Sequence, residues 1–334
     1  MQRNTIPIKL EITDKYKYDY CIVGSGIAGL ILSNELLESK KSICLIEEGY
    51  IGKTNDTPLN SVTNKGIDHK GIFEGRFVGF GGSSTAWGGQ LLPFQNNDFK
   101  KRNYLNHEGW PIKNKDLLPY LSKAEKLLGV NQFPYNKSLL KFFRNIKNLP
   151  EINGINIRFS KWIPISKRNL ANTLGKKILK SNIDFYQGSK VSKLKLKKNQ
   201  VDGVEVINLK KERIFIRAET IIIASGTIES CRILLNSPDL EKNINFDPNK
   251  NLGKFFHDHL SIISGALKDK YRKTFLQNFA PFYKNSTRHS PKFEASPEWQ
   301  RKNSSLNIMA HFIYESKENS FINKLRKVIS FYQK

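Results

Sequence analysis

Six residues near the N-terminus carry the spacing of a dinucleotide-binding turn, Gly24-Ser25-Gly26-Ile27-Ala28-Gly29. In such a turn the first glycine permits a tight bend, and the second admits the backbone close to a diphosphate. The third glycine lets the following helix pack close to the strand, and the helix N-terminus offers unpaired N–H groups to the anion. The candidate diphosphate-binding residues are therefore Gly24, Ser25, Gly26, Ala28 and Gly29.

An acidic residue, Glu47, follows 18 residues after Gly29. A carboxylate at this distance can accept hydrogen bonds from both ribose hydroxyls, and it would repel a ribose phosphate, which argues against NADP. The glycine motif also follows an apolar strand and opens a helix within a βαβ unit of about thirty residues. A glycine-rich turn without a ligand is therefore the less favoured interpretation.

A second glycine-dense loop covers residues 79–89, where five of eleven positions are glycine. Backbone of this kind can approach a flat ring closely, and its N–H and hydroxyl groups can bond a phosphate or a flavin edge. Trp87 could cover a ring face, although a tryptophan packed in the core fits equally well. The candidate residues of this loop are Gly79, Gly82, Ser83, Ser84, Thr85, Trp87 and Gly88.

Elements that would position these loops can be read from the hydrophobic pattern. The segments expected around the two turns are strands 18–23, 42–47, 191–196, 201–207, 213–217 and 220–224, and helices 30–38 and 228–235. The three strands from 191 to 217 predict an antiparallel meander that leads back to the apolar strand 220–224. A chain that leaves the nucleotide domain and returns in this way is typical of large FAD folds, so FAD is favoured. An NAD-dependent dehydrogenase remains an alternative.

Outside this region the pattern predicts helices at 115–128, with Gly129 as a stop, and at 170–180. Weaker signals predict strands at 261–267 and 307–314 and a basic amphipathic helix at 321–332. The expected fold class is α/β: an FAD-binding doubly wound fold with an antiparallel β-meander insertion, plus part of an α+β substrate domain. The expected domain segments are 1–110 (FAD-binding, first part), 111–181 (substrate or cap insertion), 182–262 (FAD-binding, second part) and 263–334 (partial substrate domain).

Composition narrows the partners. The formal net charge is +25, but lysine is scattered through every segment and no nucleic-acid-binding motif accompanies it, so no nucleic-acid partner is expected. Cys21, Cys44 and Cys231 lack metal or redox spacing and predict reduced thiols. No signal-peptide core or membrane-length apolar run is found, so a cytoplasmic location and no integral membrane segment are expected. The pair in His257-Asp258-His259 has no third ligand cluster, so no metal site is expected.

Five stretches in order resemble the glucose-methanol-choline (GMC) family of FAD-dependent oxidoreductases, and the resemblance covers residues 18–262. They are the nucleotide motif with Glu47 and Gly49, Gly81–Ser84, the stretch from Trp110-Pro111 to Glu125, Ile221–Ser230, and Asn251–His259. The resemblance implies hydride transfer from an alcohol or sugar CH–OH group to flavin N5, with the electron acceptor unassigned. It also implies that Val191 meets adenine through its backbone, that Ala224 and Gly226 line the returning strand, and that Asp258 lies near the flavin.

Two departures from the family pattern modify this expectation. Ala86 stands where one sugar-oxidising branch has a flavin-linking histidine, so the FAD is expected to be noncovalent. The family's C-terminal segment with its catalytic histidine has no match, and neither His289 nor His311 lies in a matching context. The catalytic residues are therefore unknown and the chain is expected to be incomplete. An FAD-binding but inactive truncated product is a further alternative.

Overall fold

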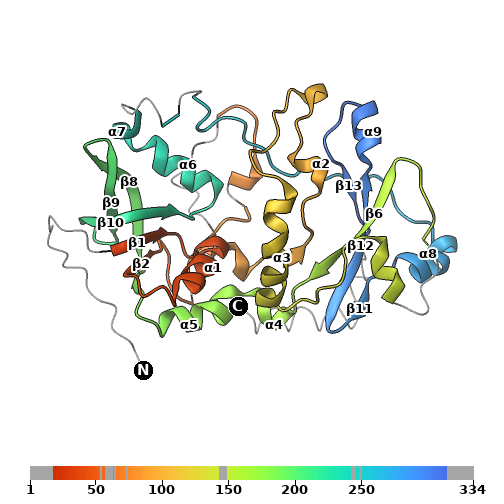
Figure 1. Cartoon of the computed structure of the whole chain (residues 1–334), viewed down its shortest axis with the longest axis horizontal. Coiled ribbons are helices and arrows are strands. Elements are labelled where there is room, and N and C mark those ends of the chain that lie inside the picture. Colours follow the sequence, from red (N-terminus) through yellow and green to blue (C-terminus); the bar gives the residue numbers. More distant parts are fainter. Residues whose placement is uncertain are drawn as a thin grey trace. The chain divides into compact units, whose positions relative to one another are not determined.

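The computed structural model describes residues 18–52, 55–56, 63, 65–72, 74–142, 149–241, 246–247 and 250–313. The chain divides into two compact units (Figure 1): unit 1 from residues 1–89 and 164–266, and unit 2 from residues 90–163 and 267–334. The chain thus changes unit after residues 89, 163 and 266, whereas the segments expected from the sequence ended at 110, 181 and 262. That four-part division into domains stays a prediction.

Unit 1 is built on a six-stranded sheet of order β7-β2-β1-β10-β9-β8. The strands are β1 (Tyr18–Val23), β2 (Ile43–Ile46), β7 (Asp184–Tyr186), β8 (Ser189–Lys197), β9 (Gln200–Asn208) and β10 (Arg213–Ile223). β7, β2, β1 and β10 run parallel, while β8, β9 and the first part of β10 form the antiparallel meander. All four residues of β2 are buried, as expected for a parallel strand covered on both faces. The α/β class and the meander are therefore confirmed.

Strand β10 differs from the sequence-based expectation of two separate strands at 213–217 and 220–224. It is one continuous strand of 11 residues. Its first five residues pair antiparallel with β9, and from Ala218 onward it pairs parallel with β1. No turn-forming residue separates the two parts, and Ala218 is fully buried. The strand therefore continues and joins the meander to the parallel sheet.

Helices of unit 1 flank this sheet. They are α1 (Ile27–Leu36), α4 (Ile165–Arg168), α5 (Lys176–Leu179), α6 (Thr227–Leu235) and α7 (Pro238–Glu241), with a π-helical turn, η6, at Ala171–Gly175. The turn and α5 together fill the helix expected at 170–180. α6 packs against β8, where Ile233 joins Val191 and Leu194 in the main core cluster. Full burial of an aliphatic side chain of this size stabilises the fold by about 1.5–3 kcal/mol.

Shorter elements of unit 1 lie before the second glycine loop and within it. They are β3 (Asn55–Asp56), which pairs with β4 (Phe77–Val78), and the 3₁₀ turns η2 (Lys70–Ile72) and η3 (Gly82–Thr85).

Unit 2 is a sheet of order β11-β12-β6-β5, with β13 added beside β12. Its strands are β5 (Gln90–Leu91), β6 (Ile155–Trp162), β11 (Phe282–Lys284), β12 (Thr287–Ala295) and β13 (Met309–Ala310). Its helices and 3₁₀ turns are α2 (Asn96–Phe99), η4 (Asn103–Leu105), α3 (Asn114–Leu128), η5 (Lys137–Phe142), η7 (Asp269–Tyr271), α8 (Arg272–Phe279) and α9 (Pro297–Lys302). α3 fills the expected helix 115–128, and Gly129 ends it in the left-handed conformation, as predicted.

Three expectations for the C-terminal third turn out differently. The strand expected at 261–267 is absent: the backbone there is irregular, and Leu260, Ile262 and Ile263 are exposed. The strand expected at 307–314 shrinks to β13. β12 was missed because it buries His289, Lys292 and Glu294, which do not alternate with apolar residues in the usual way. The helix expected at 321–332 lies outside the described residues.

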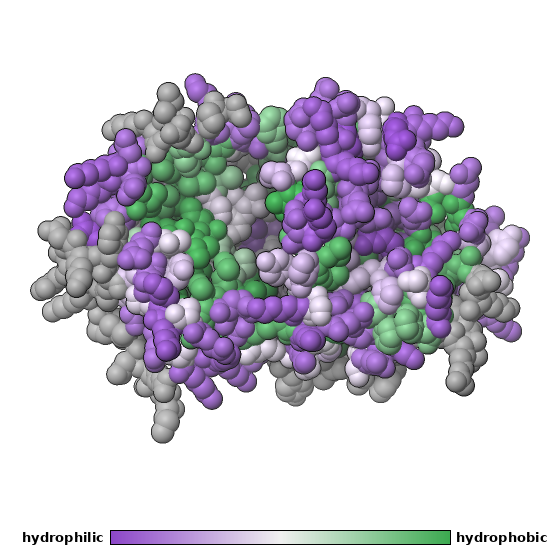
Figure 2. Space-filling model, viewed as in Figure 1, coloured by the Kyte–Doolittle hydropathy of each residue, from purple (hydrophilic) through white to green (hydrophobic). Residues whose placement is uncertain are grey.

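On the face that Figure 2 shows, the coloured hydrophilic residues lie in several places and not in one patch, and a broad apolar area lies among them. This distribution agrees with lysines scattered along the sequence.

Candidate functional site

The first glycine turn lies where three strand ends of unit 1 meet. The Gly24 N–H donates to the Ile46 carbonyl of β2 (2.8 Å), and the Ala224 N–H after β10 donates to the Val23 carbonyl (2.8 Å). Gly24 has φ +98°, and a Cβ there would lie 2.8 Å from the Ala224 carbonyl oxygen. A Cβ on Gly29 would lie 1.9 Å from the Gly24 carbonyl oxygen. Both positions therefore require glycine, for the two reasons that the motif predicts.

The N-terminus of α1 is open toward this turn. Gly26 caps the helix without a side-chain hydrogen bond, and the first turn contains no acidic residue. A Cβ on Gly26 would meet no atom within 4 Å. The helix N-terminus therefore carries its partial positive charge without a side-chain cap, which is the arrangement that binds a diphosphate.

The second glycine loop lies directly on the first. The Gly81 N–H donates to the Ser25 carbonyl oxygen (3.0 Å). Gly82 has φ +50°, and a Cβ there would lie 2.9 Å from the Gly26 Cα. The two loops, separated by more than fifty residues in the sequence, thus form one continuous backbone surface.

Glu47 ties these loops together through hydrogen bonds to four donors. Its Oε2 accepts the Ser25 N–H (2.9 Å) and the Ser25 hydroxyl (2.7 Å). Its Oε1 accepts the Gly49 N–H (2.9 Å) and the Gly79 N–H (3.1 Å). The residue is only 8% exposed. Each oxygen already has two donors, so ribose hydroxyls could bind this carboxylate only by displacing some of them.

The hydroxyl groups of the second loop mostly fold the loop itself. The buried Ser84 hydroxyl donates to the Gly81 carbonyl (2.6 Å) and accepts the Leu170 N–H (3.2 Å). The Thr85 hydroxyl donates to the Gly82 carbonyl (2.8 Å). The exposed Ser83 hydroxyl makes one long contact among the described residues, 3.4 Å to the Gly75 carbonyl. Of the three, Ser83 is therefore the hydroxyl most accessible to a ligand.

Trp87 is half-buried in unit 1, and the neighbouring Gly88 is exposed. The Trp87 indole N–H donates to the Arg168 carbonyl at the end of α4 (2.9 Å). The sequence left open whether Trp87 covers a ligand ring or packs in the core, and this contact favours packing in the core.

The turn after β10 completes the same edge of the sheet. Gly226 has φ +80°, caps α6 without a side-chain hydrogen bond, and has free space where a Cβ would lie. Ala224 and Ser225 lie against Gly24. The structure therefore brings the candidates at 24–29, 79–82 and 224–226 together.

Val191 lies on β8 at an irregularity that the sequence did not indicate. The register between β8 and β9 shifts between Val191 and Lys193. The Val191 carbonyl accepts a hydrogen bond from Arg232 Nη2 of α6 (2.7 Å). Glu229 and Arg232 lie three residues apart on a helix, and this spacing could have predicted that they form a charged pair. The spacing does not predict that Arg232 reaches the Val191 carbonyl.

Asp258 is placed differently from the other candidates. Its Oδ2 lies 3.6 Å from His69 Nε2 and next to Gly71. The described contacts of Asp258 include none with the glycine turns. The neighbouring His257 and His259 side chains are exposed and lie outside any strand.

A buried polar cluster lies in unit 2. Lys161, which is 0% exposed, donates to Glu125 Oε1 (2.5 Å) and to the Asn131 carbonyl (2.7 Å). His289 is also fully buried, with Nε2 2.9 Å from the Asn131 amide nitrogen. Burial, and then the charge of Lys161, lower the pKa of His289 to about 4, so the ring is neutral at pH 7.

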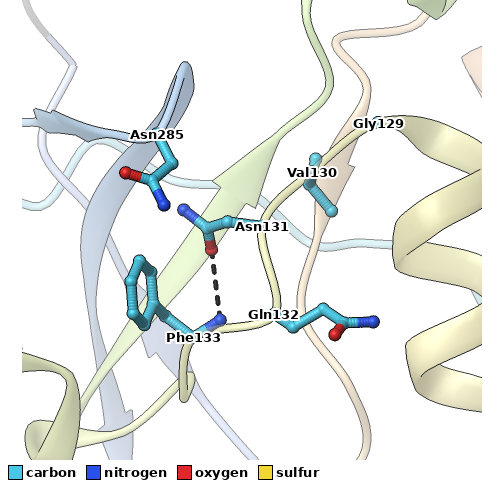
Figure 3. A pocket seen from close by; sticks show the side chains of 6 residues that line it. All are labelled: Gly129, Val130, Asn131, Gln132, Phe133 and Asn285. Atoms are coloured by element: carbon cyan, nitrogen blue, oxygen red, sulfur yellow. Dashed lines mark hydrogen bonds between the residues drawn. The ribbon is translucent and has the colours of Figure 1, made fainter.

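A surface hollow of about 460 Å³ adjoins this cluster and is lined by residues 129–133 and Asn285 (Figure 3). The Asn131 and Asn285 side chains face each other, while Gln132 points away from them. The Asn131 amide already donates to the Lys284 carbonyl (2.8 Å) and accepts the Phe133 N–H (3.3 Å). Because the polar groups of Asn131 are engaged within the fold, we assign no ligand to this hollow.

Among the residues that the structure describes, no three His, Cys, Asp or Glu side chains lie close enough together to hold a metal ion. In the same part of the chain no helix combines the length and apolar character needed to cross a bilayer. Cys21, Cys44 and Cys231 form no disulfide; the first two are buried and Cys231 is partly buried.

Comparison with known proteins places this chain near one enzyme family. Residues 166–261 match the N-terminal family model of the GMC oxidoreductases. The chain is 24% identical over 128 residues to 6'''-hydroxyparomomycin C oxidase of Streptomyces lividus, covering 34% of this chain and 23% of that protein. It is 24% identical over 314 residues to glucose dehydrogenase (FAD, quinone) of Drosophila pseudoobscura pseudoobscura, covering 76% of this chain and 49% of that protein.

Similar solved structures include pyridoxine 4-oxidase from Mesorbium loti, with 20% identity, a TM-score of 0.39, and coverage of 67% of this chain and 53% of that one. A fungal aryl-alcohol oxidase matches with 16% identity, a TM-score of 0.44, and coverage of 67% and 48%. The resemblance to the GMC oxidoreductases that the sequence motifs indicate is confirmed at low identity. The chain spans about half the length of the glucose dehydrogenase that it matches.

Proposed function

We propose, from this relationship to the GMC oxidoreductases, that the chain is the FAD-binding part of an oxidoreductase that acts on CH–OH donors. The observation that carries the proposal is the meeting of three separate turns at one sheet edge. The turns at 24–29, 79–82 and 224–226 present open helix N-termini and closely approaching backbone. A long nucleotide with a diphosphate at its centre is the ligand class that such a surface suits best.

The residues present fit the cofactor in chemistry. The N–H groups at the start of α1 would hold the diphosphate, because no side chain caps them and no acidic residue lies in the first turn. The exposed Ser83 and the loop around Gly82 and Gly88 would face the flavin half. Bound FAD would supply the hydride acceptor. Ala86 offers no side chain for a covalent link, which supports noncovalent binding.

The catalytic base remains unassigned. His289 is neutral, which suits a base, but it is fully buried in unit 2 and bonded to Asn131, so it is not placed to meet a substrate. The names of the two curated relatives, a glucose dehydrogenase and a hydroxyparomomycin oxidase, support a sugar or another alcohol as the substrate class. The cytoplasmic location and the lack of a nucleic-acid partner stay predictions from the sequence, and the electron acceptor stays unassigned.

The proposal is tested by the nucleotide that copurifies with the folded chain. Visible flavin absorption, with FAD identified by mass spectrometry after denaturation, is the expected result. Recovery of NAD in its place would support the dehydrogenase alternative. A well-folded preparation that is colourless and takes up no added FAD would refute the assignment.

A second measurement separates the active enzyme from an inactive FAD-binding product. Bleaching of the flavin by members of a panel of sugars and primary alcohols, without oxygen, is expected for the enzyme. The inactive product would bleach only with a chemical reductant such as dithionite, and that result would refute alcohol oxidation by this chain alone while leaving FAD binding intact.

A further inference from the structure

Helix α6 holds the backbone of β8 at the residues where the β8–β9 register shifts. Arg232 donates from Nη2 to the Val191 carbonyl (2.7 Å) and from Nη1 to the Ser192 carbonyl (3.3 Å). Two successive carbonyls on a regular strand would point to opposite sides, so one guanidinium reaches both only because the bulge turns them. The planar fork of arginine suits such a paired contact.

Two residues that directly follow the helix hold the same strand. Asn236 Nδ2 reaches the Ser192 carbonyl at 3.4 Å, and the fully buried Ser237 hydroxyl accepts the Leu194 N–H at 2.8 Å. α6 and the two residues after it therefore contact β8 along its backbone from Val191 to Leu194.

Arg232 is itself held by an acidic partner. Its Nε donates to Glu229 Oε2 (2.6 Å), and Arg76 Nη2 donates to Glu229 Oε1 (3.0 Å). Burial alone would raise the pKa of Glu229, but the hydrogen bond from Arg232 and the nearby positive charges keep that pKa below its usual value. The carboxylate stays charged at neutral pH and fixes the direction of the guanidinium.

This network lies at the same sheet edge as the candidate site. α6 begins directly after Gly226, and Arg76 precedes β4 and the second glycine loop. The network of Arg76, Glu229 and Arg232 thus connects the turn after β10, the second loop and Val191, the β8 residue that the family resemblance assigns to adenine. The edge of adenine presents an amino donor beside a ring-nitrogen acceptor, which one residue's backbone carbonyl and N–H can match. The Val191 carbonyl has two lone pairs, one of which accepts from Arg232.

We propose that Arg232, oriented by Glu229, is a positioning residue that holds the bulged backbone at Val191 in the geometry needed to recognise the adenine end of the nucleotide. This inference rests on the proposed function and adds a residue pair to it. Arg232 acts through Val191 and does not itself contact the reacting atoms.

The experiment compares three ligands that share different parts of FAD. FAD contains the flavin and adenosine halves, ADP carries the adenosine half alone, and FMN carries the flavin half alone. Dissociation constants for all three are measured with the full chain for wild type, Arg232→Met, Arg232→Lys and Glu229→Gln. Arg217→Met is the matched control, because Arg217 also pairs with a carboxylate on this sheet, at 3.1 Å from Asp202.

Arg232→Met is expected to weaken FAD and ADP by about tenfold, the scale of one lost charged hydrogen bond, and to leave FMN unchanged. Arg232→Lys is expected to lie between wild type and Arg232→Met, since an ammonium group can reach only one of the two carbonyls well. Glu229→Gln is expected to follow Arg232→Met in direction, and Arg217→Met to match wild type for every ligand.

The opposite results are distinguishable. Equal weakening of FAD, ADP and FMN by Arg232→Met would show a general structural role and overturn the inference. Unchanged FAD and ADP binding would overturn it as well, while leaving the proposed function standing. Wild-type protein that binds neither FAD nor ADP would refute the proposed function, and the inference with it.

Discussion

Replacement of Glu47 by glutamine tests whether its carboxylate organises the two glycine loops or is free for a ribose. The carboxylate accepts two donors from Ser25 on one oxygen and the Gly49 and Gly79 N–H groups on the other. Glu47→Gln keeps the shape but converts one acceptor into a donor. The change is therefore a loss of hydrogen-bond acceptance at nearly constant volume.

The cost depends on which way the new amide faces. With its NH₂ toward Gly49 and Gly79, two buried N–H groups would lose their acceptor. With its NH₂ toward Ser25, the serine hydroxyl can rotate to accept, and only the Ser25 N–H is left without a partner. The second orientation is cheaper, and one buried donor without an acceptor costs about 1–3 kcal/mol. We expect the free energy of unfolding of the ligand-free protein to fall by about this amount.

Urea unfolding of the ligand-free protein measures this loss, and hydrogen exchange of the peptide around Ser25 reports the local loosening. Glu48→Gln is the matched control: Glu48 is the adjacent acid, half-exposed, and pairs with Lys190 at 3.1 Å. A surface pair of this kind contributes about 0–1 kcal/mol. An unchanged unfolding free energy for Glu47→Gln, together with clearly weaker FAD binding, would refute the reasoning and support the free ribose-binding role predicted from the sequence.

Three more predictions concern single features of the fold. Gly29→Ala should prevent folding of unit 1, because its Cβ would lie 1.9 Å from a backbone oxygen, whereas Gly26→Ala should fold normally and bind FAD more weakly. Thermal melts and FAD titration compare the two variants. Equal melting temperatures would contradict this prediction. Protonation of His289 should destabilise the fold, because its folded pKa of about 4 lies below the unfolded value of 6.5. The free energy of unfolding keeps its full value above pH 6.5 and decreases by roughly 3 kcal/mol as the pH falls toward 4. His289→Gln should flatten the pH dependence of urea unfolding in that window, and an unchanged slope would sink the assignment. Lys161→Met should destabilise the chain by about 3–5 kcal/mol, because Glu125 would remain buried without the lysine. Adding Glu125→Leu should restore most of the lost free energy of unfolding, measured with urea. A double variant no more stable than the single one would contradict the importance of this ion pair.

Local patterns in the sequence were sufficient for the elements around the nucleotide motif. Glycines at 24, 26 and 29 must follow a strand and open a helix, because only that arrangement uses the tight turn, the open cap and the close helix contact together. The alternation of apolar and polar residues at 191–217 was sufficient to predict the meander, and Gly129 was sufficient to predict the end of α3. These signals are readable because each depends on residues only a few positions apart.

Other features depended on contacts between distant segments. Nothing between Arg217 and Thr220 shows that β10 changes partner from β9 to β1 without a break. β12 was missed because its buried polar residues are matched by partners more than a hundred residues away, such as Arg158 for Glu294.

The amino-acid sequence by itself determined the nucleotide-binding motif, the α/β class and the family resemblance, since these rest on residue types at short, fixed spacing. Only the tertiary structure decided that the Glu47 carboxylate is occupied by Ser25, Gly49 and Gly79, and that Arg232 holds the Val191 carbonyl. The physical reason is that a carboxylate or a guanidinium can bond any suitable group within reach. Which groups come within reach is settled when the sheet brings its strand ends to one edge.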